Sequence, residues 1–138
     1  MTPQEALQSG RAILDPVLEP HGFNYFETSA GKGSGGYFAS AEYSIGDRRL
    51  ELHFRYSLGL VRYHFGFMSL SHEEYMTAKL GGSGRSAYPG FSADPIDGFR
   101  HLREDLESHC GEFLSGDRVS FGNLVDLVSR LPQRRLPQ

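Results

Sequence analysis

The stretch RRLELHFRYSLGLVRYHFGF, residues 48–67, holds the side chains best suited to bind or react with another molecule. Polar and apolar residues alternate along it, and this period of two is typical of β-strands that bury one face. The polar side chains of interest are Glu51, His53, Arg55, Arg62 and His64. Guanidinium groups bind carboxylates and phosphates, and imidazole adds sensitivity to pH. The pattern therefore predicts either a site for an anion or a partner's carboxylates, or simply the solvated face of an antiparallel sheet.

Two turns set the order of these side chains across the predicted sheet. Gly46-Asp47 closes a hairpin between strands 37–45 and 48–56, and the Leu58-Gly59 region closes a second hairpin with strand 60–67. Pairing residue 45 with 48, and residue 56 with 61, keeps one apolar face intact across all three strands. A slip of one residue would destroy that face.

This register places like charges side by side on the polar face, which sheet stability alone disfavours. The predicted rows are Ser40–His53–His64, Phe38–Arg55–Arg62 and Glu42–Glu51. Such rows have the groups to hold an anion or a partner's carboxylates, beside the interpretation as a solvated face. A metal ion held by the two histidines and a glutamate is an alternative, since opposite residues approach within about 5 Å. No metal-binding motif accompanies them, and no metal or cofactor is predicted.

Other residues with chemical potential fall on predicted helices. Asp97, His101, Asp105 and His109 recur every four residues, which favours an exposed helix face with weak ion pairs over a zinc site lacking a third ligand. Cys110 lies on the apolar side of its helix, where a thiol serves as packing. No catalytic constellation is assembled, so a non-catalytic protein is expected.

The segment 81–93 carries two aromatic residues, Tyr88 and Phe91, in a Gly-rich loop. They either fold down on the core or remain available as a contact site for a partner. We keep both as candidate binding residues beside those of the polar sheet face.

The remaining sequence predicts the elements that position these side chains. Thr2-Pro3-Gln4-Glu5 forms a capping box that opens a helix over 2–21, and residues 23–29 form a strand candidate. AGKGSGG, residues 30–36, reads as a flexible loop without the flanking features of a phosphate-binding loop. Further helices are expected from Ser71 to about residue 80, from Asp94 to about residue 115, and over 118–131, followed by a frayed tail from about residue 132.

This order predicts one α+β domain over residues 1–138. An N-terminal helix precedes an antiparallel meander of three to four strands, and two to three further helices pack on one face of the sheet. A net charge of −3 argues against a nucleic-acid or anionic-membrane binder. One cysteine, no apparent signal peptide and no apolar run of about 20 residues favour a cytoplasmic protein.

The segment LDPVLEPHGFNYF resembles the opening of several small bacterial α+β families of unknown function, some of them immunity proteins beside polymorphic toxins. The resemblance rests on Leu14, Pro16, Leu18, Gly22 and Phe23. It implies recognition of a protein partner and brings no site residues. Two functions are therefore expected: a cytoplasmic binding protein for a protein partner, or a small-molecule or anion-binding protein or enzyme using the His/Arg face. The sequence does not indicate an oligomeric state.

Overall fold

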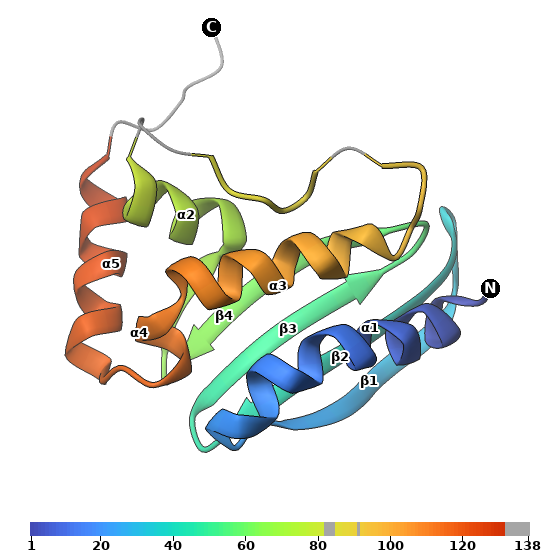
Figure 1. Ribbon diagram of the computed structural model, residues 1–138, viewed down its shortest axis with the longest axis horizontal. Helices are drawn as coiled ribbons and strands as arrows, with labels where there is room; N and C mark the ends of the chain where they lie inside the picture. The colour runs from blue at the N-terminus through green and yellow to red at the C-terminus, as the bar shows by residue number, and fades with distance from the viewer. Residues whose placement is uncertain (82–84, 91, 132–138) are drawn as a thin grey trace, which may run out of the picture.

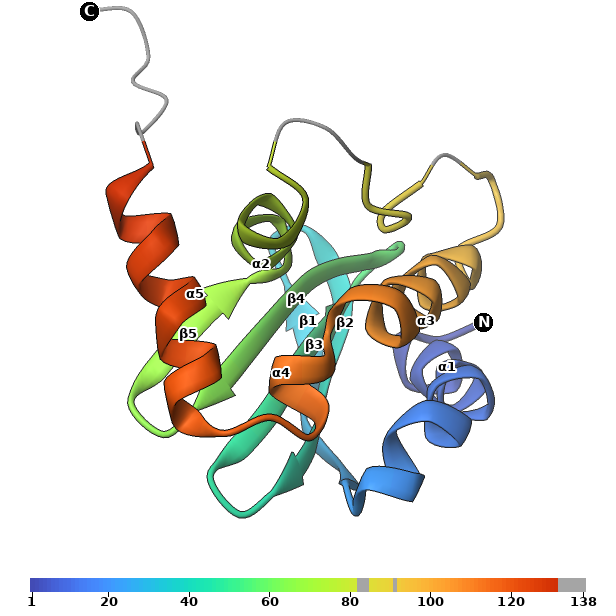
Figure 2. The same cartoon turned by 60° about the vertical axis from the view of Figure 1, so that its left-hand side comes forward.

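A computed structural model describes residues 1–81, 85–90 and 92–131 of the chain. Within these residues one antiparallel sheet has five strands in the order β1–β2–β3–β4–β5 (Figures 1 and 2). The strands are β1 (Asn24–Gly33), β2 (Gly36–Ile45), β3 (Arg48–Phe54), β4 (Leu58–Phe65) and β5 (Met68–Ser71). The predicted α+β order of helix, meander and helices is confirmed, with more strands than the three to four expected.

The extra strand structure lies at the two ends of the meander. β5 has only four residues and follows a turn at Gly66, whose φ of 60° favours glycine. The Gly-rich segment 30–36 is a β-hairpin rather than the expected loop, because Gly33 pairs with Gly36 around a tight turn. The pairing of these strands depends on backbone hydrogen bonds. A glycine-rich segment has few side chains, so no alternation of polar and apolar residues indicates a strand there.

The helices confirm most of the predicted boundaries. They are α1 (Pro3–Leu18), η1 (Glu19–His21), α2 (His72–Leu80), α3 (Asp97–His109), α4 (Gly111–Leu114) and α5 (Arg118–Arg130). The capping boxes that begin at Thr2 and Ser71 are both present. The helix expected from Asp94 instead begins at Asp97 and is interrupted at Cys110. Asp94 forms a side-chain turn before it, accepting a hydrogen bond from the backbone N–H of Ile96 at 2.9 Å.

The helices lie on one face of the sheet and build the core against it (Figures 1 and 2). α1 and α3 pack against each other so closely at Gly10 that an added Cβ would lie 2.4 Å from the Phe99 ring. The inward residues of the sheet are buried: Ala39, Ala41, Tyr43, Leu50, Leu52, Phe54, Val61, Tyr63, Phe65 and Leu70. No helix of the described chain covers the opposite face, which we call the open face.

The register is confirmed in the first hairpin and wrong in the second. β2 and β3 pair as predicted, with Tyr43 opposite Leu50 and Glu42 opposite Glu51. β3 and β4 pair in another register than predicted: Leu52 faces Val61 instead of Phe65, a displacement of four residues along β4. A bulge between His53 and Phe54 and an earlier turn at residues 55–57 produce this shift. A shift by an even number of residues preserves the apolar face, which is why the pattern did not exclude it.

Candidate functional site

The corrected register changes which polar residues meet on the open face. One row now reads Phe26–Glu42–Glu51–Arg62–Ser71, and the next reads Ser44–Arg49–His64–Ser69. Ser40 and His53 are opposite each other as predicted, and Leu60 faces His53 in place of His64. The two arginines expected in one row are separated, because Arg62 lies beside Glu51 and Arg55 lies beyond the end of β3.

Glu51 is the centre of a hydrogen-bonded cluster on the open face. Its two carboxylate oxygens contact Nε2 of His53 at 2.6 Å and Nε2 of His64 at 2.7 Å. Nδ1 of His53 contacts Oγ of the buried Ser40 at 2.6 Å. Partial burial raises the pKa of Glu51, but the hydrogen bonds from the two histidines outweigh burial and hold it below its ordinary value. His53 and His64, predicted to be opposite each other, instead contact the two oxygens of Glu51, so that each group is already partnered.

This cluster does not have the form of a metal centre. Both histidines direct Nε2 toward the same carboxylate instead of toward a shared empty point. Across residues 1–81, 85–90 and 92–131, no group of three or more histidine, cysteine, aspartate or glutamate side chains is placed to hold a metal ion.

The two arginines of the open face have different partners. Arg49 donates to Glu42 across a distance of 3.3 Å. Arg62 donates to the Ser69 hydroxyl at 2.9 Å and has no carboxylate within ion-pair distance among the described residues. Both oxygens of Glu51, the residue opposite Arg62, are engaged by histidines, so the hydrogen bond of Arg62 goes to Ser69 instead.

Arg55 lies away from the open-face cluster, at the tip of the β1–β2 hairpin. Its guanidinium packs on Gly35, where an added Cβ would lie 1.8 Å from Nη1, and approaches the Phe38 ring at 5.9 Å. Tyr56 donates a hydrogen bond to the Gly35 carbonyl at 2.9 Å. The hairpin turn therefore holds two neighbouring side chains of the β3–β4 connection in fixed positions.

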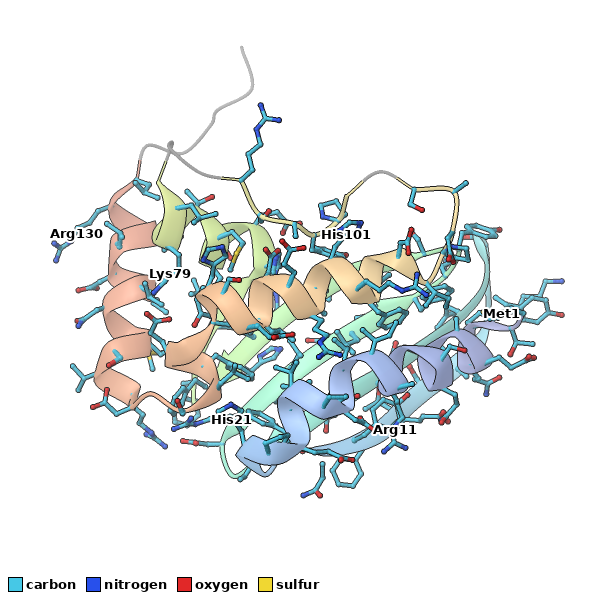
Figure 3. The ribbon with its side chains drawn as sticks, viewed as in Figure 1. Met1, Arg11, His21, Lys79, His101 and Arg130 are labelled. Atoms are coloured by element: carbon cyan, nitrogen blue, oxygen red, sulfur yellow. The ribbon has the colours of Figure 1, made fainter. Side chains whose placement is uncertain are left out.

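A cleft opens between this hairpin tip and the start of α1, at the end of the molecule where Figure 3 labels Met1. Its volume is about 680 Å³, within the range of small-molecule sites. The lining combines Lys32 and Arg55 with the rings of Tyr37, Phe38 and Tyr56. We call this region the hairpin cleft.

The hairpin cleft is cationic although the chain as a whole is acidic. None of its lining residues is an aspartate or glutamate. Lys32 approaches the Tyr37 ring at 5.4 Å, and neither Lys32 nor Arg55 forms an ion pair within the described chain. The backbone N–H groups of α1 add little, because Thr2 already caps the helix and Pro3 has no N–H. Sequence analysis missed this cleft because residues 30–36 were expected to form a loop.

A second polar network is sealed inside the core, and sequence analysis missed this one too. His72 contacts the Tyr63 hydroxyl through Nδ1 at 2.7 Å and an Asp105 oxygen through Nε2 at 2.8 Å. Asp105 also accepts hydrogen bonds from the backbone N–H groups of Ala87 at 2.7 Å and Tyr88 at 2.9 Å. The network joins α2, α3 and the segment 85–90, so its role is to hold these pieces together.

The network corrects the expectation for Asp105 and decides between the two alternatives for Tyr88. Asp105, expected on an exposed helix face, is 1% exposed, because α3 turns this side toward α2. Burial raises the pKa of Asp105, but His72 and the two backbone donors hold it below its ordinary value. Tyr88 folds down on the core, with its hydroxyl donating to the Leu58 carbonyl at 2.5 Å. Phe91, its companion in the prediction, lies outside the described residues.

The nucleophiles of this network are not accessible to a substrate. Cys110 is buried, its Sγ lies 3.6 Å from the Tyr63 hydroxyl, and burial raises its pKa to about 12. His72 is 1% exposed and Tyr63 is fully buried. A thiol or hydroxyl that stays protonated and has no route to solvent does not act as a nucleophile. The hairpin cleft and the open face are thus the two candidate functional surfaces.

Comparisons of the chain with protein families, curated proteins and solved structures found no match. The immunity-like resemblance accordingly stays a prediction. None of the helices in the described ranges has the length and apolar character needed to cross a bilayer.

Proposed function

We propose that this protein is a non-catalytic binding protein whose ligand is a small organic anion held in the hairpin cleft. The observation that carries the proposal is the pairing of two cations, Lys32 and Arg55, with three aromatic rings in a cleft that has no acidic lining residue. Lys32 and Arg55 would bind a carboxylate or phosphate, and the rings would stack on an apolar body. This combination favours an aromatic ring that carries a carboxylate or phosphate.

The positions of the described histidines, of Asp105 and of Cys110 support binding rather than catalysis. His72, Asp105 and Cys110 are sealed in the core, and His53 and His64 are hydrogen-bonded to Glu51. The sequence predicted a small-molecule site on the whole His/Arg face. Of those residues, the proposed site keeps only Arg55, and it adds Lys32.

Thermal-shift measurements with three related probes test this proposal. Phenyl phosphate supplies both the ring and the anion, phenol supplies the ring only, and inorganic phosphate supplies the anion only. A ligand at about 100 times its dissociation constant adds about 2.7 kcal/mol to the free energy of unfolding. We expect the largest shift with phenyl phosphate. Equal shifts with phosphate and phenyl phosphate, or none with any probe, would contradict the proposal.

Matched variants locate the effect. Arg55→Gln should weaken phenyl phosphate binding by about tenfold or more, because a charge-assisted hydrogen bond contributes about 1.5–3 kcal/mol. Gly35→Ala should weaken binding with every charge retained, since its Cβ displaces the Arg55 guanidinium. Arg130→Gln, an exposed arginine on α5, is the control and should leave binding unchanged.

A second candidate function is recognition of a protein partner, as in a cytoplasmic, immunity-like role. It is favoured by the open face, where Phe26 is 52% and Leu60 is 42% exposed beside polar groups that already have partners. Paired polar groups cost less to remove from water than free ones. This function is supported if the wild type captures a protein partner and the Leu60→Glu variant does not. The control variant Val119→Glu, on α5, should still capture the partner.

A further inference from the structure

The outer edge of β1 is the longer of the two edges of the sheet. β1 has ten residues, all but one of them exposed, and its only strand partner in the described chain is β2. The opposite edge is protected, because β5 has four residues and α5 lies beside it (Figure 2). Alternate residues of an edge strand direct their N–H and C=O groups outward, where a second extended chain can bind them.

The regular part of this edge is the stretch 29–33. A β-bulge directly before it interrupts the ladder, and from there the pairing with β2 continues unbroken to Gly33 and Gly36. Because Gly33 and Gly36 close a two-residue turn, they form a hydrogen-bonded pair. The N–H and C=O groups of Ala30 and Lys32 therefore point away from β2. The serine and glycines of the stretch have small side chains or none, so these backbone groups are accessible to a second chain.

This edge leads into the hairpin cleft. Ala30, Gly31 and Lys32 belong to the edge and also line the cleft. Arg55 lies against the end of β1, since a Cβ added at Gly33 would be 3.5 Å from its Nη2 atom. A chain that pairs with the edge would therefore reach both cations at the point where β1 ends.

The chemistry of the cleft and of the edge together selects the end of a peptide as the ligand. The rings of Tyr37 and Tyr56 are 63% and 75% exposed and can contact an aromatic side chain. Lys32 and Arg55 can bind a carboxylate, which no acidic residue among the described lining would repel. The C-terminal residue of a peptide is the one residue that brings an aromatic ring, a free carboxylate and a backbone able to pair with β1.

We therefore propose that the hairpin cleft binds the C-terminus of a peptide or protein that ends in an aromatic residue and adds to the edge of β1 as a strand. The inference rests on the proposed function and names its ligand. The carboxylate lies where β1 ends, so the peptide runs parallel to β1. The stretch 29–33 spans about 13 Å at about 3.3 Å per residue, which a peptide of about four or five residues matches.

Isothermal titration calorimetry of the purified full chain tests the inference with three probes. They are acetyl-Ala-Ala-Ala-Ala-Phe with a free carboxylate, the same peptide with a C-terminal amide, and N-acetylphenylalanine. The acid peptide should bind about tenfold or more tightly than N-acetylphenylalanine, since two added backbone hydrogen bonds contribute about that factor. It should exceed its amide by a similar factor, because the amide forms no charge-assisted hydrogen bond with the two cations.

Methylation of the peptide nitrogens tests the strand pairing itself. Successive N–H groups of a strand point to opposite sides, so only alternate amides of the peptide can bond to β1. N-methylation of that alternate set should weaken binding about tenfold or more, and N-methylation of the other set should leave it unchanged. Lys32→Gln should reduce the preference for the acid over the amide, and the control Arg130→Gln on α5 should retain it.

Two results would overturn the inference: an acid peptide that binds no more tightly than N-acetylphenylalanine, or N-methylation that acts equally on both sets of amides. The proposed function then still stands if phenyl phosphate binds and Arg55→Gln weakens that binding. If phenyl phosphate does not bind either, the proposed function fails together with the inference.

Discussion

The buried contact between His72 and Asp105 should be the most sensitive polar point of the fold. Both side chains are only 2% exposed, and the contact joins two helices whose residues are 33 positions apart in the chain. In the His72→Ala variant, Asp105 keeps two backbone hydrogen bonds but loses its histidine, and the Tyr63 hydroxyl loses a partner. Removing one member of a buried pair costs about 3–5 kcal/mol. We expect a loss at the lower end, about 3 kcal/mol, because the two backbone donors remain.

Urea denaturation followed by circular dichroism measures this loss. With a slope of about 2 kcal/mol/M, the midpoint should fall by roughly 1.5 M. His64→Ala is the matched control, because His64 also contacts a carboxylate, at 2.7 Å, but its side chain is 21% exposed. Its cost should stay below about 1 kcal/mol, as for other solvent-exposed pairs. Equal losses in the two variants would refute the reasoning that burial sets the magnitude.

Three further results are expected. Cys110 should resist thiol-specific reagents at pH 8 in the folded protein and react in urea, because burial raises its pKa to about 12; rapid labelling without denaturant would contradict this. Gly10→Ala should lower the free energy of unfolding by about 1–3 kcal/mol, since its Cβ meets the Phe99 ring, and calorimetry would measure the change. Stability should fall as the pH drops below about 4. The pKa of Asp105 is held below 3.8 in the folded state, so its stabilising effect is complete above that value and is lost at lower pH. Acid titration of Asp105→Asn should show a shallower loss, and an unchanged curve would contradict the assignment.

Side-chain alternation was enough to predict the core face and the first hairpin. Ala39 and Ala41 face Phe54 and Leu52 as expected, because the tight turn at Gly46-Asp47 fixes that register. The second hairpin was mispaired by four residues, since a shift by an even number leaves every side chain on the same face. The bulge after His53 that causes the shift has no signature in the alternation.

The candidate sites depend on contacts between residues that are far apart in the chain. The sequence indicates such contacts less well than it indicates strands and turns. His53 and His64 were expected opposite each other, and in the corrected register they meet only through Glu51, which lies between them on the same two strands. Arg55 was separated from them by the bulge, and Lys32 joins it only because a glycine-rich segment forms a hairpin. The pairing of His72 with Asp105 depends on how two helices pack, which local periodicity does not report.

The most direct test of the central claim is a ¹H–¹⁵N correlation spectrum of the chain titrated with phenyl phosphate. The account predicts saturable shifts at the backbone amides of residues 30–32, 36–38 and 55–56 and at the start of α1, which together line the hairpin cleft. The amides of the buried network around His72 should not move. Shifts confined to other parts of the chain, or no saturable shift at all, would contradict the proposal that this cleft binds an aromatic anion.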